Sequence, residues 1–223
     1  MPIAKRPAAV LFDCDGVLAD SEGLVNRMVA ADLTERGWPL TAGQARETFL
    51  GMALPDMVPM IHARCGGLPQ DWATSLSRRI VQALLDEVEA VPGAVAALQA
   101  VAAAGIPLAV ASNSTRDELV AKLARLELAG FFGDRVFSFE DVARPKPAPD
   151  MYLAAAAACG AAPQNCVVVE DSLLGARAGI AAGCRVFGFT RETDPRVLAA
   201  VGAVTFHSMA ELPDLLGIAG GGA

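Results

Sequence analysis

The stretch AAVLFDCDG, residues 8–16, indicates the class of fold and contains the first residues of the candidate site. Five apolar residues are followed by Asp13 and Asp15, and Gly16 comes next. The apolar run is typical of a buried strand, in which residues i and i+2 point the same way. Both carboxylates then lie at one strand end, where they repel each other unless a cation or a proton intervenes. The alternative is a strand that ends in a turn, with both aspartates hydrogen-bonded to their own backbone.

The composition indicates a folded, acidic protein. The chain has 223 residues, of which 53% are hydrophobic, and a formal net charge of -7 at pH 7. Such a chain can bury a substantial core, in one large domain or two unequal ones. The acidic balance argues against a nucleic-acid-binding protein, because such proteins depend on basic patches. A phosphorylated substrate would therefore need a local cation, a lysine or backbone N–H groups.

The cysteines and the hydropathy pattern bear on the compartment. The five cysteines are scattered and contain no CxxC pair, which predicts free thiols in a cytoplasmic protein. The longest uncharged stretch, residues 90–115, is interrupted by prolines and glycines, so we expect no membrane span there. The apolar run after the N-terminus is too short for a signal peptide.

Apolar runs alternate with helical patterns from Pro92 onward. Such alternation predicts an α/β fold, a Rossmann-like and mainly parallel sheet covered by helices on both faces. Ligands of these sheets bind at the carboxyl ends of the strands, which is where Asp13 and Asp15 are expected. The expected strands are 108–111, 135–139, 167–169, 185–189 and 203–206, and the expected helices are 94–104, 114–127, 150–159 and 172–182. The helix over 114–127 is expected to be ended by Gly130 and to carry an apolar stripe of Leu119, Val120, Leu123 and Leu126.

Residues 21–89 break this alternation. A helix is expected over residues 21–36, and a second one is indicated by Trp72, Leu76, Ile80 and Leu84 at four-residue spacing. We therefore predict that residues 1–20 and 90–223 form an α/β catalytic core and that residues 21–89 form a helical cap domain. Turns are expected between the helical pieces, at Trp38-Pro39, Leu54-Pro55 and Gly66-Gly67.

Three more polar clusters follow strand-like runs: Ser112-Asn113-Ser114, Arg144-Pro145-Lys146-Pro147 and Glu170-Asp171-Ser172. A hydroxyl at Ser112 and an amide at Asn113 can hold phosphate oxygens, although capping of the next helix is the simpler role for Ser114. Flanking prolines stiffen the backbone around Lys146. Glu170 and Asp171 can complete an oxygen shell begun by Asp13 and Asp15, and such a shell suits Mg²⁺.

The four segments DCDGVLADSE, VASNS, RPKPAPDMY and VVVEDSLLGARAG together resemble the signature motifs of the haloacid dehalogenase superfamily. The similarity is greatest to its phosphatase and β-phosphoglucomutase-like group, which carries a helical cap after the first motif. The resemblance implies that Asp13 attacks phosphorus and forms a phosphoaspartate, while Asp15 transfers protons. It also implies that Ser112, Asn113 and Lys146 hold the phosphoryl group, and that Mg²⁺ is bound by Asp13, the Asp15 backbone carbonyl, Glu170 and Asp171.

The resemblance favours a phosphatase over related activities. Dehalogenases of this superfamily lack the second aspartate, which is present here as Asp15. Mutases carry a histidine and an arginine where this chain has Val25 and Leu54. A sugar-phosphate mutase, a phosphoglycolate phosphatase and a non-enzymatic phosphoacceptor module remain as alternatives. The expected partner is a small-molecule phosphoester such as a sugar or sugar-acid phosphate, with no nucleic acid and no membrane, bound by a monomer or a weak homodimer.

Overall fold

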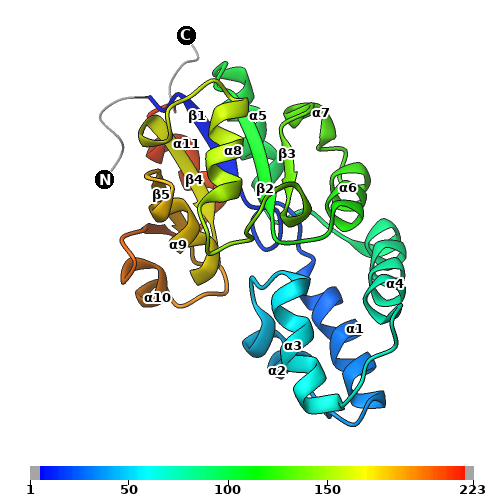
Figure 1. Ribbon diagram of the computed structural model, residues 1–223. Coiled ribbons are helices and arrows are strands. Elements are labelled where there is room, and N and C mark those ends of the chain that lie inside the picture. Colours follow the sequence, from blue (N-terminus) through cyan, green and yellow to red (C-terminus); the bar gives the residue numbers. More distant parts are fainter. Residues whose placement is uncertain (1–5, 219–223) are drawn as a thin grey trace.

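The computed structural model describes residues 6–218, and a six-stranded parallel sheet lies at its centre (Figure 1). The strand order is β3-β2-β1-β4-β5-β6, which is the Rossmann order, so the predicted Rossmann-like α/β fold is confirmed. The strands are β1 (Ala9–Phe12), β2 (Leu108–Ser112), β3 (Val136–Ser138), β4 (Cys166–Glu170), β5 (Arg185–Phe189) and β6 (Val204–Phe206).

Strand β1 lies between β2 and β4, and this position determines where the candidate site lies. Its last residue, Phe12, pairs with Val110 of β2 and with Val169 of β4. The residues that follow these partners at the strand ends therefore meet at one edge of the sheet. This edge is the switch point between the two halves of the sheet, where open α/β sheets bind ligands.

Helices cover both faces of the sheet, because alternate residues of each strand point in opposite directions. Val10 and Phe12 belong to one buried apolar cluster, and Ala9 and Leu11 belong to the other. The sheet-covering helices are α5 (Ala94–Ala103), α6 (Arg116–Arg125), α7 (Ala129–Phe132), α8 (Asp150–Ala158), α9 (Leu173–Ala181), α10 (Pro195–Ala199) and α11 (Leu212–Leu215). Short 3₁₀ segments are η1 (Phe139–Asp141), η2 (Pro163–Asn165) and η3 (Met209–Glu211).

Four of the five helices between β1 and β2 lie within residues 21–89, which we call the helical insertion. They are α1 (Glu22–Glu35), α2 (Ala42–Phe49), α3 (Leu54–Cys65) and α4 (Trp72–Glu87). Figure 1 shows them below the carboxyl ends of the strands, with α4 beside α6. The buried Asp32 of α1 links this helix to α4, since it accepts hydrogen bonds from Trp72 and Arg79 of α4, as well as from Arg36. The division of the chain into two domains stays a prediction.

Three local predictions are wrong. Leu54-Pro55 is not a turn but the beginning of α3, because proline is well tolerated in the first turn of a helix. Gly130 does not end the preceding helix: α6 ends at Arg125, and Gly130 lies in α7. Val120 does not face the core, since it is 50% exposed, whereas Lys122 is buried.

No helix of the part of the chain described, residues 6–218, is long and apolar enough to cross a membrane. The five cysteines are free thiols, as the sequence predicts.

Gly179→Ala should destabilise the fold by about 1–3 kcal/mol, because overpacking a close contact forces neighbouring atoms to move. A Cβ at this position of α9 would lie 2.7 Å from Val186 Cγ2. Gly130→Ala is the matched control, since a Cβ there meets nothing within 4 Å. Urea unfolding measures both variants, and equal stability of the two would contradict this packing account.

Candidate active site

Lys146 connects the ends of three neighbouring strands. Its Nζ donates hydrogen bonds to Asp13 Oδ1 at 2.7 Å, to Glu170 Oε1 at 2.6 Å and to the Ala111 carbonyl at 2.8 Å. The side chain is only 2% exposed. Burial lowers the lysine pKa, but the charges of Asp13 and Glu170 outweigh this effect and hold it above its ordinary value. Lys146 is therefore a fixed positive charge at the switch point.

Glu170 is held on every side. Its Oε1 also accepts from the Tyr152 hydroxyl at 2.9 Å, and its Oε2 accepts from Ser172 Oγ and from the backbone N–H groups of Asp171 and Ser172, each at 3.0 Å. A Cβ on Gly175 would lie 1.6 Å from Glu170 Oε1, so only glycine fits there. The Glu170 carboxylate is thus held in place, and its hydrogen bond from Lys146 fixes the position of the lysine beside Asp13.

Asp13, Glu170 and Asp171 form a buried carboxylate cluster in which one oxygen from each lies within 4.8 Å of the others. Burial and the Glu170 charge raise the pKa of Asp13 to about 8, although Lys146 opposes this rise. Burial and the carboxylate of Glu22 likewise raise the pKa of Asp171. Lys146 alone does not balance the charges of three carboxylates. A divalent cation that prefers oxygen ligands would balance the remaining charge.

Gly16 makes room for this cluster. Its φ is +72°, and a Cβ on it would lie 2.1 Å from Asp171 Oδ2. The backbone after Asp15 can therefore approach the Asp171 carboxylate closely only because residue 16 is glycine. The three carboxylates are hard oxygen donors of the kind that Mg²⁺ prefers, so Asp13, Glu170 and Asp171 could hold such an ion together.

The carboxylate of Asp15 points away from the cluster. Lys122 Nζ donates to its Oδ1 at 2.6 Å, and Ser21 Oγ donates to the same oxygen. Ser112 Oγ and Ser114 Oγ donate to Oδ2 at 2.8 and 2.9 Å. Burial would raise the pKa of Asp15, but Lys122 and the hydroxyls more than offset this, and the carboxyl pKa falls below its ordinary value. Asp13 and Asp15 therefore occupy opposite electrostatic environments.

Sequence reasoning missed Lys122, which is 1% exposed on α6. Its Nζ also donates to Ser114 Oγ at 2.6 Å. The available signal was its spacing: Lys122 lies three residues after Leu119 and four before Leu126, on the buried face of the helix. A lysine on an apolar helix face indicates a buried acidic partner.

Two predicted phosphate-binding residues contact protein atoms. Ser112 donates to Asp15, as described. Asn113 Nδ2 donates to the carbonyls of Gly51 and Lys146 at 2.7 and 3.1 Å, and its Oδ1 accepts from Lys146 N at 3.0 Å. Asn113 lines the cavity, and its amide also joins the helical insertion to the Lys146 loop, because two backbone carbonyls converge on it.

A cavity of about 150 Å³ lies between the strand ends and the helical insertion. Its floor includes Asp13, Asp15 and Lys146. The insertion supplies a mostly apolar wall, which includes Val25 and Leu54. Five of the predicted site residues line this cavity: Asp13, Asp15, Ser112, Asn113 and Lys146. Glu170 and Asp171 do not line it, but they lie beside Asp13 in the carboxylate cluster.

The sequence profile of the haloacid dehalogenase-like hydrolases matches residues 7–183. The chain is 34% identical over 213 residues to the 6-phosphogluconate phosphatase of Escherichia coli K12, covering 95% of each chain. It is 35% identical to hexitol phosphatase A of the same organism, covering 93% of this chain and 94% of the relative. A solved haloacid dehalogenase family hydrolase of Deinococcus radiodurans R1, with bound phosphate and sodium, is 35% identical with a TM-score of 0.75, and the match covers 96% of this chain and 98% of that one.

The chain therefore belongs to the haloacid dehalogenase-like hydrolase family. The family that the four motifs indicate is confirmed, and so is the prediction of an enzyme of the hydrolase class.

The carboxylate cluster predicts a pH-dependent stability in metal-free protein. Folded Asp13 keeps its proton up to about pH 8, whereas the unfolded chain loses it near its ordinary value of 3.8. Because the folded state then binds more protons, stability should fall as pH rises from about 5 to about 8. Thermal unfolding in EDTA should show a smaller fall for Asp13→Asn. Added Mg²⁺ should raise Tm most at the upper end of the range, and an equal Mg²⁺ effect at both ends would contradict the prediction.

The Lys122–Asp15 pair predicts a coupled stability effect. Lys122→Met leaves a largely buried carboxylate without its cation and should destabilise the fold by about 3 kcal/mol, the lower end for a broken buried pair, because the Asp15 side chain is 26% exposed. The double variant Lys122→Met/Asp15→Asn should recover part of this loss, because no uncompensated charge remains. Urea unfolding of the two single variants and the double variant measures the coupling, and strict additivity would show that the pair does not interact energetically.

Proposed function

We propose that this protein is a Mg²⁺-dependent phosphatase that hydrolyses a small phosphorylated metabolite, such as a sugar or sugar-acid phosphate, through a phosphoaspartate on Asp13. The observation that carries the proposal is the contact of one buried lysine with both Asp13 and Glu170, next to Asp171. The printed names of two relatives, a 6-phosphogluconate phosphatase and a hexitol phosphatase, support the substrate class. The phosphate bound in the Deinococcus hydrolase supports a phosphate site.

In the first half-reaction, an Asp13 carboxylate oxygen attacks phosphorus and the bond to the leaving alcohol oxygen breaks. Asp13 must be ionised to act as the nucleophile. Lys146 favours that form through its hydrogen bond to Oδ1, and it also attenuates repulsion between the carboxylate and the anionic phosphoryl group. Bound at Asp13, Glu170, Asp171 and the Asp15 backbone carbonyl, Mg²⁺ would supply the remaining neutralising charge.

Asp15 is proposed to move the protons. The alkoxide that leaves in the first half-reaction takes a proton from the Asp15 carboxyl group. In the second half-reaction the Asp15 carboxylate removes a proton from water as that water attacks phosphorus, and the bond to Asp13 breaks. Lys122 and three hydroxyls stabilise the ionised form, which is the form that the second half-reaction needs. To act as an acid, Asp15 has to take up a proton and turn from Lys122 toward the substrate.

The helical insertion is proposed to act as the cap over this chemistry. The hydrogen bond from Asn113 Nδ2 to the Gly51 carbonyl attaches it to the loop that carries Lys146. A closed cavity excludes bulk water and strengthens the charge interactions of the floor. Val25 and Leu54, which line the wall, offer no side chain that would bind a second phosphate, so hydrolysis is favoured over a mutase reaction.

Asp13→Asn should lower phosphate release from sugar, sugar-acid and polyol phosphates by a factor of about 10³ or more, because the nucleophile is lost. EDTA should abolish release by the native protein, and Mg²⁺ should restore it. Asp56→Asn is the matched control, since Asp56 is exposed on α3.

The same assay tests the alternatives. Phosphate release that survives Asp13→Asn would contradict the mechanism. Formation of an isomeric sugar phosphate without net phosphate release would replace the phosphatase proposal with the mutase. Phosphorylation of Asp13 without turnover would indicate a phosphoacceptor module.

A further inference from the structure

A short polar edge lies where the helical insertion meets the core. Ser77 Oγ of α4 donates to Glu118 Oε1 of α6 at 2.7 Å, and it lies 3.3 Å from Thr115 Oγ1. All three residues line the cavity. The edge therefore offers hydroxyl groups that donate or accept hydrogen bonds and a carboxylate that accepts them.

The rest of the wall that the insertion contributes is largely apolar. Four helices and the loop after α2 provide it, and its members include Val25, Phe49, Met52, Leu54, Leu76 and Ile80. An apolar wall offers no compensation to a charged group that leaves water. The polar members of this wall outside the edge are Ser21, Glu22 and Asn26, none of which carries a positive charge. A ligand that fills this space can place hydroxyl groups along the edge and its carbon surface against the apolar part of the wall.

The positive charge of the cavity is confined to its floor. Among the cavity-lining residues of the described chain, Lys146 is the one lysine or arginine, and it contacts Asp13 and Glu170. Lys122 lies below the surface, paired with Asp15. Burial raises the pKa of Glu118 while Lys122 opposes the rise. Along this edge the cavity lining thus presents a carboxyl group and no cation.

We propose that the cavity selects phosphate esters whose leaving alcohol is uncharged and carries a hydroxyl group for the Ser77–Thr115–Glu118 edge, and that it rejects esters with a second anionic group. This inference rests on the proposed phosphatase function and narrows its substrate class to polyol and neutral sugar phosphates. A sugar-acid phosphate brings its carboxylate into a space with an acidic edge and an apolar wall. The carboxylate would lose its hydration there, and no positive charge in the lining would offset that cost in free energy.

Two probes that differ at one carbon test the proposal. Sorbitol 6-phosphate carries an uncharged alcohol at carbon 1, where 6-phosphogluconate carries a carboxylate. For the native holoenzyme with Mg²⁺, kcat/KM should be higher for sorbitol 6-phosphate by about tenfold or more, which is the scale of one unfavourable charge contact in a partly buried site. Phosphate release measures both substrates.

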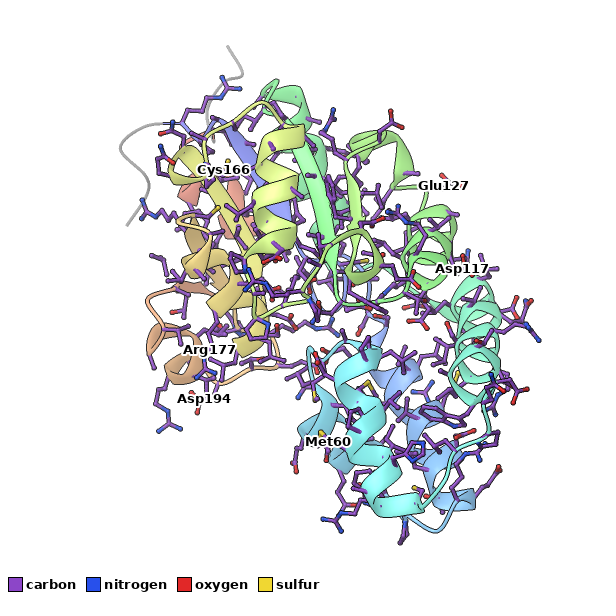
Figure 2. The ribbon with its side chains drawn as sticks, in the orientation of Figure 1. Met60, Asp117, Glu127, Cys166, Arg177 and Asp194 are labelled. Carbon is purple, nitrogen blue, oxygen red and sulfur yellow. The ribbon has the colours of Figure 1, made fainter. Side chains whose placement is uncertain are left out.

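Glu118→Gln should reduce this ratio by about threefold or more, because it removes the like charge but keeps an acceptor for Ser77. Asp117→Asn is the matched control. It makes the same charge change on the neighbouring residue of α6, which is exposed and labelled in Figure 2. The control should leave the ratio unchanged, since solvent screens an exposed charge.

Leu54→Arg provides an independent test that does not depend on the folding of Glu118→Gln. It adds a cation at a half-buried position of the cavity wall and should raise the relative kcat/KM for 6-phosphogluconate. Equal or faster turnover of 6-phosphogluconate by the native enzyme would overturn the inference and leave the phosphatase proposal intact. A ratio unchanged in both Glu118→Gln and Leu54→Arg would overturn it as well. Failure to release phosphate from any ester would overturn the proposed function, and this inference with it.

Discussion

The buried contact of Lys146 with two carboxylates is the interaction on which the rest of the site depends. Asp13, Glu170 and Asp171 come from the ends of two adjacent strands, and they cannot all remain ionised and buried without positive charge. The surrounding structure serves this requirement, because Tyr152, Ser172 and two backbone amides satisfy Glu170 and leave Lys146 directed at Asp13. The parallel sheet brings the three carboxylates together, and the positive charge of Lys146 reduces the repulsion between them.

The two aspartates that follow β1 are separated by one residue, and their carboxyl pKa values are shifted in opposite directions. Asp13 shares its lysine with Glu170 and retains its proton to about pH 8 without metal, whereas Asp15 has Lys122 and three hydroxyls to itself and ionises readily. Environments that shift the pKa values of two carboxyl groups in opposite directions commonly give the two groups different catalytic roles. Both residues follow the end of β1 at Phe12, so the strand does not hold their side chains on one face, and they reach different neighbours, Lys146 and Lys122.

The strand ends and the four motifs could be predicted from sequence, because apolar runs and the polar residues directly after them are local patterns. The tasks of Lys122 and Asn113 could not, since each depends on a partner brought in by tertiary packing: Asp15 lies 107 residues from Lys122, and Gly51 lies 62 residues from Asn113. The helix α3 was missed for a different reason. Its Pro55 has the same local signature whether it begins a turn or a helix.

The Asn113 amide has a consequence for how this architecture can change. It binds the backbone of residue 51, in the loop that lines the cavity, and the backbone of residue 146, which carries the lysine. Exchanging the helical insertion with that of a relative would therefore alter substrate preference and lysine placement together, unless the new loop returns a carbonyl to the same point. The insertion and the lysine loop are therefore expected to evolve together, because the Asn113 side chain contacts both of them.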